Sequence, residues 1–509
     1  MRLQALLLVV GIVVTARHAS ADEPLELGLS PLAPSVSALV TPTQIETAET
    51  NSSRDWALQI HGFLRAPMAI GIGPRPNTVA GQSPLGVHSP PMTADSNYVN
   101  WGYTNLIGSP WAELKITFGN TRAAATVSLA AYNLTDAGYR NLTAQLGFNQ
   151  AFLTLHFPRV VRRTDLVVNA GAFANGYGGS GKYDAGRYDT YVIGRTHVAG
   201  EQTNISIDLG HKWQLQIEQG FGVKLDVIPF QNNNTLPSYL PYPGPAAQGT
   251  TLLHHEHIGL KYSTKVLLGL HYLKAWTQDG RASIAGPDQN APTDQPDGSQ
   301  EIIGADVRFN GGVFGDGYFG VSRLAADHVL QVADAIEVIH SIGGWQLANN
   351  YLGPNCNGGT GTIWSLMFQY TFSLAKALRA PEPFWGQGPD VLCTFFGMAN
   401  WVSSPDPIYH KITKFKWGAD VTYLFLRWMG AAARFDMLEP NMNDDRRSFY
   451  AITANLIFRT AFVTHEQLIV GYTHYFYGPD VVATFQPGFP NSMFKPDPDA
   501  LQIRAVMWW

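Results

Sequence analysis

The chain has 509 residues, of which 45% are hydrophobic, 12% aromatic and only 14% charged, and its formal net charge is −5. An ordinary soluble domain has about 25% charged residues, so the surface of this protein is unusually poor in charge. The 13 Trp, 21 Tyr and 26 Phe exclude a disordered chain, the pI of about 6.3 excludes a basic nucleic-acid binder, and the lack of an 18-residue apolar run after residue 21 excludes a membrane-spanning helix.

The first 21 residues are typical of a secretory signal peptide. Arg2 supplies the basic start, residues 6–14 are apolar, and Ala19-Ser20-Ala21 gives the small residues of a cleavage site. A buried N-terminal helix is the alternative interpretation. Residues 22–55 are rich in Pro, Ser, Thr and Glu without periodicity, which predicts a flexible periplasmic lead-in. Residues 56–509 are predicted to form one domain.

From Trp56 onward the hydrophobic pattern has a period of two, as in half-buried strands. In residues 111–118, for example, apolar residues occupy every second position, with Glu113, Lys115 and Thr117 between them. A water-soluble sandwich also shows this alternation, so the pattern alone does not decide the fold. The sequence predicts about 18 strands, near 56–73, 111–118, 122–133, 142–157, 164–173, 202–209, 213–228, 255–262, 265–276, 300–309, 313–324, 361–373, 389–400, 414–428, 431–438, 448–460, 466–477 and 499–509.

The connections between these strands are long and short in turn. Pro-, Gly- and Asn-rich stretches such as 74–110 and 277–299 alternate with tight turns such as 119–121 and 310–312. A transmembrane β-barrel has short periplasmic turns, longer extracellular loops and an even strand number. We therefore predict an all-β fold, a single transmembrane antiparallel β-barrel of about 18 strands, with 16–18 as the expected range.

The last strand carries the most specific motif. Gln502 and Arg504 share its polar face. Its apolar face consists of Leu501, Ile503, Ala505, Met507 and Trp509. This pattern resembles the C-terminal strand of Gram-negative outer-membrane β-barrel proteins of the porin type, which the barrel-assembly machinery recognises. Trp509 departs from the Phe more common there, and Ala505 is unusually small.

The resemblance implies a place in the outer membrane of a Gram-negative bacterium, reached with a cleavable signal peptide. It also implies the partners: outer-membrane lipid, the barrel-assembly machinery, small hydrophilic solutes and, as in many porins, further copies in a homotrimer. No nucleic-acid partner is expected.

Charged residues on the polar strand faces predict a water-filled lumen lined by both signs. An alternative is that they pair with one another and only stabilise the wall. Because the signs are mixed, the sequence does not predict a preference for anions or cations. The candidate pore-lining residues are Glu113, Lys115, Asp165, Glu218, Asp306, Arg308, Asp420, Arg434, Asp436, Arg459 and Arg504.

One segment breaks the period of two. In residues 327–342 the apolar residues recur at helical spacing, and Gly343-Gly344 would end the helix. Such a helix, with Asp334 and Glu337, could fold from the 325–360 loop into the lumen as a constriction. A helix capping the barrel outside, or one more irregular strand, are the alternatives.

The sequence predicts no enzyme, no catalytic residue, no metal and no cofactor. It contains no G-x-S-x-G or H-E-x-x-H motif, and the cluster at 254–257 (His-His-Glu-His) is interpreted as a polar strand entrance. We therefore expect a porin-like channel for passive diffusion of small hydrophilic solutes. Two alternatives stay open: a barrel hydrolase with a Ser/His/acid site on its rim, and a structural or adhesive barrel with an occluded lumen.

Overall fold

The computed structural model contains two β-sheets among its described residues, a large one of nineteen strands and a small one of two. The described residues are 56–72, 112–132, 145–175, 183–184, 189–190, 196–224, 228–229, 250–278, 299–330, 359–378, 390–403, 411–426, 428–439, 442–443, 445, 448–460, 465–477 and 499–508. The predicted signal peptide and lead-in, 1–21 and 22–55, lie outside these ranges.

Within the described residues, one sheet contains eighteen strands of eight to seventeen residues each. The first nine are β1 (Ala57–Ile72), β2 (Ala112–Gly119), β3 (Ala123–Tyr132), β4 (Gln145–Val161), β5 (Thr164–Asn175), β8 (Thr196–Gly210), β9 (Trp213–Lys224), β11 (Thr250–Tyr262) and β12 (Val266–Gln278). The other nine are β13 (Ser299–Asn310), β14 (Asp316–Leu330), β15 (Gly359–Ser373), β16 (Asp390–Ser403), β17 (Ile412–Leu426), β18 (Met429–Glu439), β19 (Phe449–Thr460), β20 (His465–Tyr477) and β21 (Asp499–Trp508).

Three two-residue strands complete the set. β10 (Ile228–Pro229) adds a short pairing to β4, at Gly147 and Phe148. β6 (Tyr183–Asp184) and β7 (Asp189–Thr190) pair with each other in a separate sheet.

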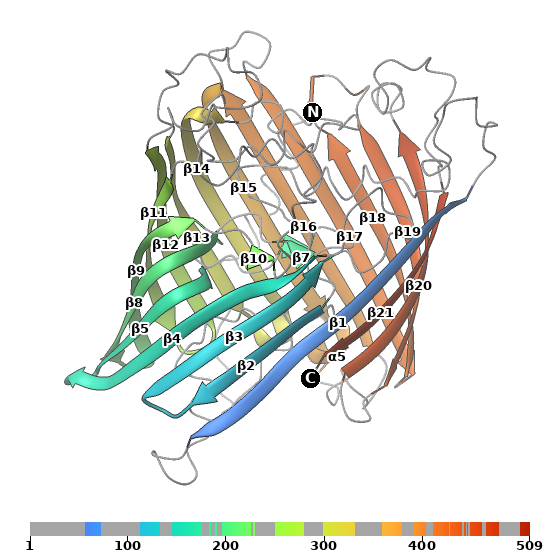
Figure 1. Ribbon diagram of the computed structural model, residues 1–509. Helices are drawn as coiled ribbons and strands as arrows, with labels where there is room; N and C mark the ends of the chain where they lie inside the picture. Colours follow the sequence, from blue (N-terminus) through green and yellow to red (C-terminus); the bar gives the residue numbers. More distant parts are fainter. Residues whose placement is uncertain are drawn as a thin grey trace. The chain divides into compact units, whose positions relative to one another are not determined.

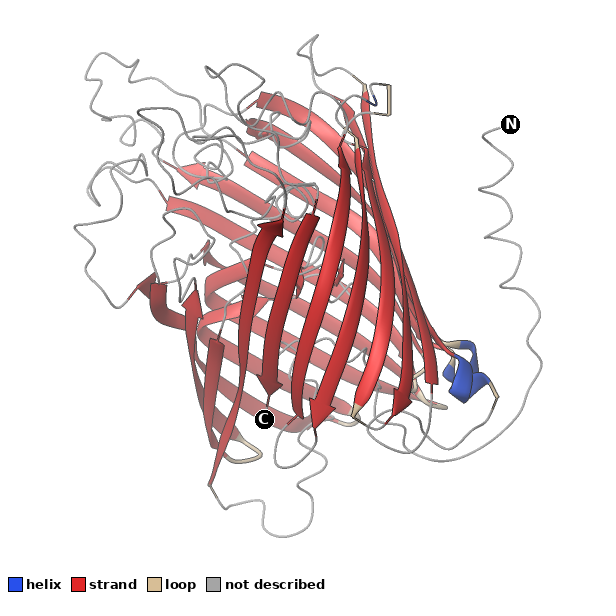
Figure 2. Ribbon diagram, turned by 90° about the vertical axis from the view of Figure 1, so that its right-hand side faces the viewer, coloured by secondary structure: helices blue, strands red, loops and turns tan. Residues whose placement is uncertain are grey.

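The eighteen long strands close into a barrel. Each pairs antiparallel with its neighbours in sequence, and β1 pairs with β21, so the first and last strands lie side by side (Figures 1 and 2). Leu64 of β1 is opposite both Ala112 of β2 and Met507 of β21, which marks where β1 passes from one partner to the other. Closure removes the sheet edges, and only helices or closed barrels satisfy their backbone groups within lipid. The predicted barrel of about 18 antiparallel strands is confirmed.

The connections divide by length between the two ends of the barrel. Two residues, 162–163, join β4 to β5, whereas 28 residues, 331–358, separate β14 from β15. In the turn between β8 and β9, His211 and Lys212 both have positive φ, 53° and 68°, as a type I′ hairpin requires. One connection on the short side is longer, because 16 residues separate β15 from β16 and begin with α5 (Leu374–Ala377).

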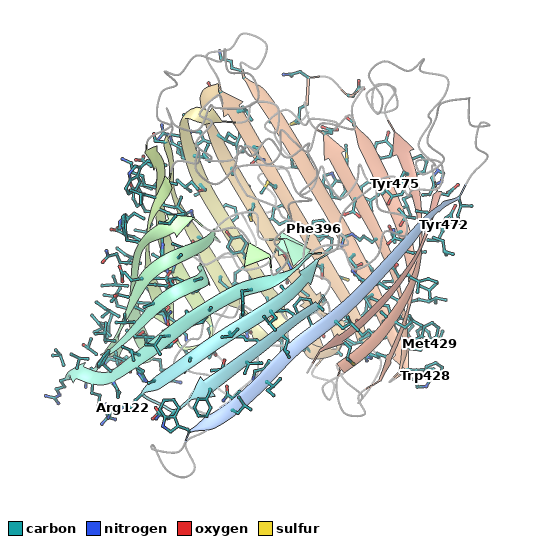
Figure 3. The ribbon with its side chains drawn as sticks, in the orientation of Figure 1. Arg122, Phe396, Trp428, Met429, Tyr472 and Tyr475 are labelled. Atoms are coloured by element: carbon teal, nitrogen blue, oxygen red, sulfur yellow. The ribbon has the colours of Figure 1, made fainter. Side chains whose placement is uncertain are left out.

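The two faces of each strand differ in chemistry. On β19, Tyr450, Ile452 and Leu456 are exposed on the outward face, Ile452 by 50%, whereas Ala451 and Arg459 face inward and are buried. Figure 3 shows exposed aromatic residues on this wall, Trp428 at its lower end and Tyr472 higher up, while Phe396 lies inside the barrel. An apolar outer face with aromatic residues toward its ends is the surface that a membrane-spanning barrel presents to lipid.

The predicted helix over 327–342 is wrong at its start. β14 extends to Leu330, so residues 327–330 are strand, and pairing with β15 outweighs the local helical spacing. The rest of this segment, including Asp334 and Glu337, lies outside the described residues. No helix in the described part of the chain has the length and apolarity to cross a membrane.

Candidate functional site

The inward face of the barrel carries the eleven charged residues that the sequence predicts to line a pore. Each occupies a strand position out of phase with the exposed apolar residues of the same strand. From β2 to β21 they are Glu113, Lys115, Asp165, Glu218, Asp306, Arg308, Asp420, Arg434, Asp436, Arg459 and Arg504. The alternation of the strands therefore brings both signs of charge to one inner wall, while their role in conduction stays a prediction.

Arg434 and Asp436 form the best-defined ion pair of this wall. Arg434 donates from Nε to Asp436 Oδ2 and from Nη2 to Asp436 Oδ1, both over 2.8 Å. The residues are two apart on β18, so their side chains lie on the same face. Two parallel hydrogen bonds fix the guanidinium plane, as in other bidentate Arg–carboxylate pairs.

An aromatic ring from β16, two strands away, contacts the same guanidinium. The Cζ atom of Arg434 lies 4.5 Å from the centroid of the Phe396 ring, which is fully buried on β16. Gly418 of β17 is opposite Phe396, and a Cβ there would lie 2.3 Å from the ring's Cζ atom. The glycine therefore leaves room for the ring to lie across β17 and reach Arg434 of β18 in a cation–π contact.

A second polar group lies on β2 and β3. Ser128 donates a hydrogen bond of 2.8 Å to Glu113 Oε1, and both residues are buried. Lys115 follows Glu113 on the same face, and the hydroxyls of Thr117 and Thr126 lie 3.1 Å apart next along the strands. Hydroxyls across the strand pair thus support a carboxylate in the wall.

The most connected polar group crosses three strands, β12 to β14. His271 Nδ1 lies 2.8 Å from Asp306 Oδ2, and His271 Nε2 lies 3.2 Å from Ser322 Oγ. All three residues are at least 98% buried. Gly304 is opposite both His271 and Ser322, and a Cβ on Gly304 would lie 2.4 Å from His271 Nε2. The imidazole therefore spans β13 at a glycine.

The same arrangement of histidine over glycine recurs on β11. His257 reaches over Gly269 of β12 toward Asp306, since a Cβ on Gly269 would lie 2.6 Å from His257 Nε2 and 2.7 Å from Asp306 Oδ1. His255 lies over Gly220 of β9, with its Nε2 atom 3.7 Å from Glu218 Oε1. These contacts extend the polar group from β9 to β14.

The sequence cluster at 254–257 is thus divided between the two faces of β11. His255 and His257 face inward, whereas His254 and Glu256 face outward and lie 3.0 Å apart. The interpretation as a strand entrance is wrong, because β11 begins at Thr250 and the cluster lies within the strand. Among the described residues, no group of three or more His, Cys, Asp or Glu side chains is arranged to hold a metal ion.

Hydrogen bonds connect Asp306 to His271 and His271 to Ser322, which is how the acid, base and nucleophile of a catalytic triad are connected. Ser322, however, is only 1% exposed, so a substrate would have little access to its hydroxyl. The strands on both sides of it pair through their backbone groups, whereas an oxyanion hole needs N–H donors that point at the substrate. The geometry fits a hydrogen-bonded wall better than a reaction centre.

Comparison with known proteins gives structural similarity only. No protein-family model matches the chain, and no curated protein matches it in sequence. The outer-membrane channel DcaP of Acinetobacter baumannii is 10% identical, with a TM-score of 0.40, and the alignment covers 90% of this chain and 99% of DcaP.

Two further solved structures are similar to the same extent. OccK9 (OpdG) of Pseudomonas aeruginosa is 8% identical, with a TM-score of 0.41 and coverage of 90% and 98%. OmpT of Vibrio cholerae, an outer-membrane protein, is 9% identical, with a TM-score of 0.36 and coverage of 90% and 99%. These similarities concern the kind of fold and assign no role to any residue of this chain.

Sequence reasoning noticed His255 and His257 only as part of the cluster at 254–257, and it missed His271, Ser322 and the contacts that join these groups. His255, His257, His271 and Ser322 bear no motif, because they lie on three different strands and meet only through the register. The one available signal is a glycine in a strand interior, which often marks a place where another group approaches the backbone.

Proposed function

We propose that the protein is a passive diffusion channel for small hydrophilic solutes in the outer membrane of a Gram-negative bacterium. One observation carries the proposal: an eighteen-strand barrel closed by β1 and β21 has an apolar outer face and charges of both signs on its inner face. Barrels of 16–18 strands are wide enough to enclose an aqueous channel, whereas barrels of about 8 strands are filled by side chains.

The experiment is conductance of the purified mature protein in planar lipid bilayers, combined with swelling of proteoliposomes in sugars and amino acids of increasing size. We expect discrete conductance steps and a size limit for the solutes. A barrel that is folded by circular dichroism and by heat-dependent gel migration, yet gives neither steps nor swelling, would overturn the proposal. That outcome would favour the structural or adhesive alternative with an occluded lumen.

Hydrolysis is the second candidate, and the hydrogen-bonded order of Asp306, His271 and Ser322 is the observation in its favour. The burial of Ser322 argues against it, so we propose that these residues stabilise the wall and that the protein is not an enzyme. A fluorophosphonate probe tests this directly. Labelling of the folded protein that disappears in S322A would support the hydrolase and contradict our proposal.

The cleavable signal peptide and the barrel-assembly machinery remain part of this proposal. The apolar face of β21, from Leu501 to Met507, supports recognition by that machinery. The homotrimer also remains a proposal, and the outer surface of the barrel gives a separate reason to expect contact between copies.

A further inference from the structure

The outer face of the barrel has a charged region on one side only. On β12 the outward residues run from Leu268 and Leu270 through Tyr272 and Lys274 to Trp276. Lys274 is exposed, and it lies nine residues into the thirteen of the strand, with an apolar residue further along on the same face. A lysine on the lipid face costs about 2–4 kcal/mol at the membrane midplane and less near the interfaces.

The neighbouring strand repeats this order. On β11, His254 and Glu256 face outward between Leu252 on one side and Ile258 on the other. The side chain of Glu256 is 49% exposed, and its one ion-pair partner among the described residues is His254, 3.0 Å away. On these two strands the polar residues are therefore flanked by apolar residues on both sides, and they do not lie at the edge of the apolar face.

The polar region continues onto the adjacent strands at matching positions in the register. Glu301 of β13 is opposite Lys274, and Arg323 of β14 is opposite Ile303, which is itself opposite Tyr272. On β8 and β9, Thr203 is opposite Gln219, and Glu201 lies two residues from Thr203 on the same face. We define this charged band as Glu201, Thr203, Gln219, His254, Glu256, Tyr272, Lys274, Glu301 and Arg323.

The rest of the outer wall lacks such a band. Among residues whose side chains the structure describes, acidic or basic groups elsewhere on the outer face lie within two residues of a strand end or in the hairpin tip of β4, apart from His474 of β20, which pairs with Asp499 of β21 over 2.7 Å. On β19, for comparison, the outward positions from Tyr450 to Phe458 are all apolar. In the described part of the chain, Lys274, Glu301 and Arg323 form no ion pair with one another.

We propose that the charged band is a contact surface for a second copy of this chain. It holds three acidic and two basic residues in addition to His254, so one copy offers partners of both signs to another. A two-fold contact between identical subunits requires such a self-complementary surface. Anionic lipid headgroups fit less well, because acidic residues outnumber basic ones.

The size of the surface is sufficient for a stable contact. Six adjacent strands spaced about 4.8 Å apart give a width of about 29 Å. Together with the apolar positions above and below it, the charged band belongs to a wall of six strands and about 25 Å in height, which offers about 700 Å² on each copy. A standard protein–protein interface buries about 800 Å² per partner. The proposal concerns assembly, so it stands or falls independently of solute conduction.

The first experiment places a photo-crosslinking amino acid at Tyr272 in the full-length protein, in intact outer membranes. Tyr450, an exposed outward aromatic residue on the opposite wall, is the matched control. From position 272 we expect a crosslinked product of twice the monomer mass, which mass spectrometry identifies as two copies of this chain. From position 450 we expect no such product. Crosslinks to lipid, to a different protein or to nothing would overturn the proposal.

The second experiment measures the mass of the detergent-solubilised protein by native mass spectrometry. We expect K274E to convert an oligomer to a monomer, since the reversed charge repels its acidic partners. The matched control is K261E, because Lys261 lies on the inward face of the same β11 strand that carries Glu256. An oligomer that K274E leaves intact, or a monomeric wild type, would contradict the proposal; should K274E not fold, the Tyr272 crosslink decides.

Discussion

Arg434 and Asp436 lie two residues apart on β18 and share two hydrogen bonds of 2.8 Å, although their side chains are only 8% and 11% exposed. The pair thus brings two opposite charges into the inner wall without leaving either one alone. Phe396, on which the guanidinium lies, covers its other surface. The Arg434 side chain is therefore held from two directions, by the carboxylate and by the ring.

Removal of Asp436 should therefore destabilise the barrel strongly. D436A removes both hydrogen bonds that the buried Arg434 guanidinium makes to this carboxylate, and loss of one partner of a buried pair costs about 3–5 kcal/mol. Urea unfolding in detergent, followed by tryptophan fluorescence, measures the change in free energy. D445A is the control, because Asp445 is exposed in the connection between β18 and β19. Equal stability of the two variants would contradict the structural role of the pair.

A change of charge at Lys115 should alter the ion preference of the channel. K115E replaces one positive charge by one negative charge on the inward face of β2, next to Glu113. Rings of like charge set the selectivity of pores, so the variant should favour cations more than the wild type does. The reversal potential of single channels under a KCl gradient measures this shift.

The control for that experiment is K265E, which makes the same substitution in the exposed turn between β11 and β12. It changes the net charge of the protein equally but lies outside the strands. A reversal potential that moves as far in K265E as in K115E would show that the effect does not arise in the lumen.

The fold could be read from the sequence because its main determinants are local. Alternation with period two and the succession of long and short connections place all eighteen strands, and the polar faces identify the inward residues. The end of β14 was misplaced, since the helical spacing after residue 327 is a weaker preference than pairing with β15. Pairing is a long-range effect that a single segment does not reveal.

The histidine groups illustrate what local patterns miss. His271 reaches Ser322 only because Gly304 stands between them, and the three residues are 18 to 51 positions apart in the chain. A shift of one residue in register would turn the ring to the other face of the sheet. The charged band on the outer face was missed for a similar reason, because its members come from six strands, β8 to β14, and only the register of their pairing brings them to one surface.

Two substitutions separate the structural role of the Asp306–His271–Ser322 chain from catalysis. H271A removes the 2.8 Å contact between the ring and the buried Asp306 carboxylate, and loss of such a contact at a buried group costs about 1–3 kcal/mol. S322A removes a single hydrogen bond and should cost about 0.5–1.5 kcal/mol. Unfolding in urea should rank H271A below S322A in stability, while both keep the wild-type conductance. The opposite ranking would require another explanation of the burial of this group.

Ile503 and Gln502 are adjacent on β21, and they provide a matched pair that tests the assignment of faces. Ile503 is on the outward face in the middle of the strand, whereas Gln502 faces inward and donates a hydrogen bond of 3.0 Å to Thr473 Oγ1. An arginine on the lipid face costs about 2–4 kcal/mol at the midplane, but on the lumen face it stays in polar surroundings. I503R should therefore reduce the folded fraction in outer membranes far more than Q502R, as measured by heat-dependent gel migration. Equal losses in the two variants would mean that β21 does not present one face to lipid and the other to the lumen.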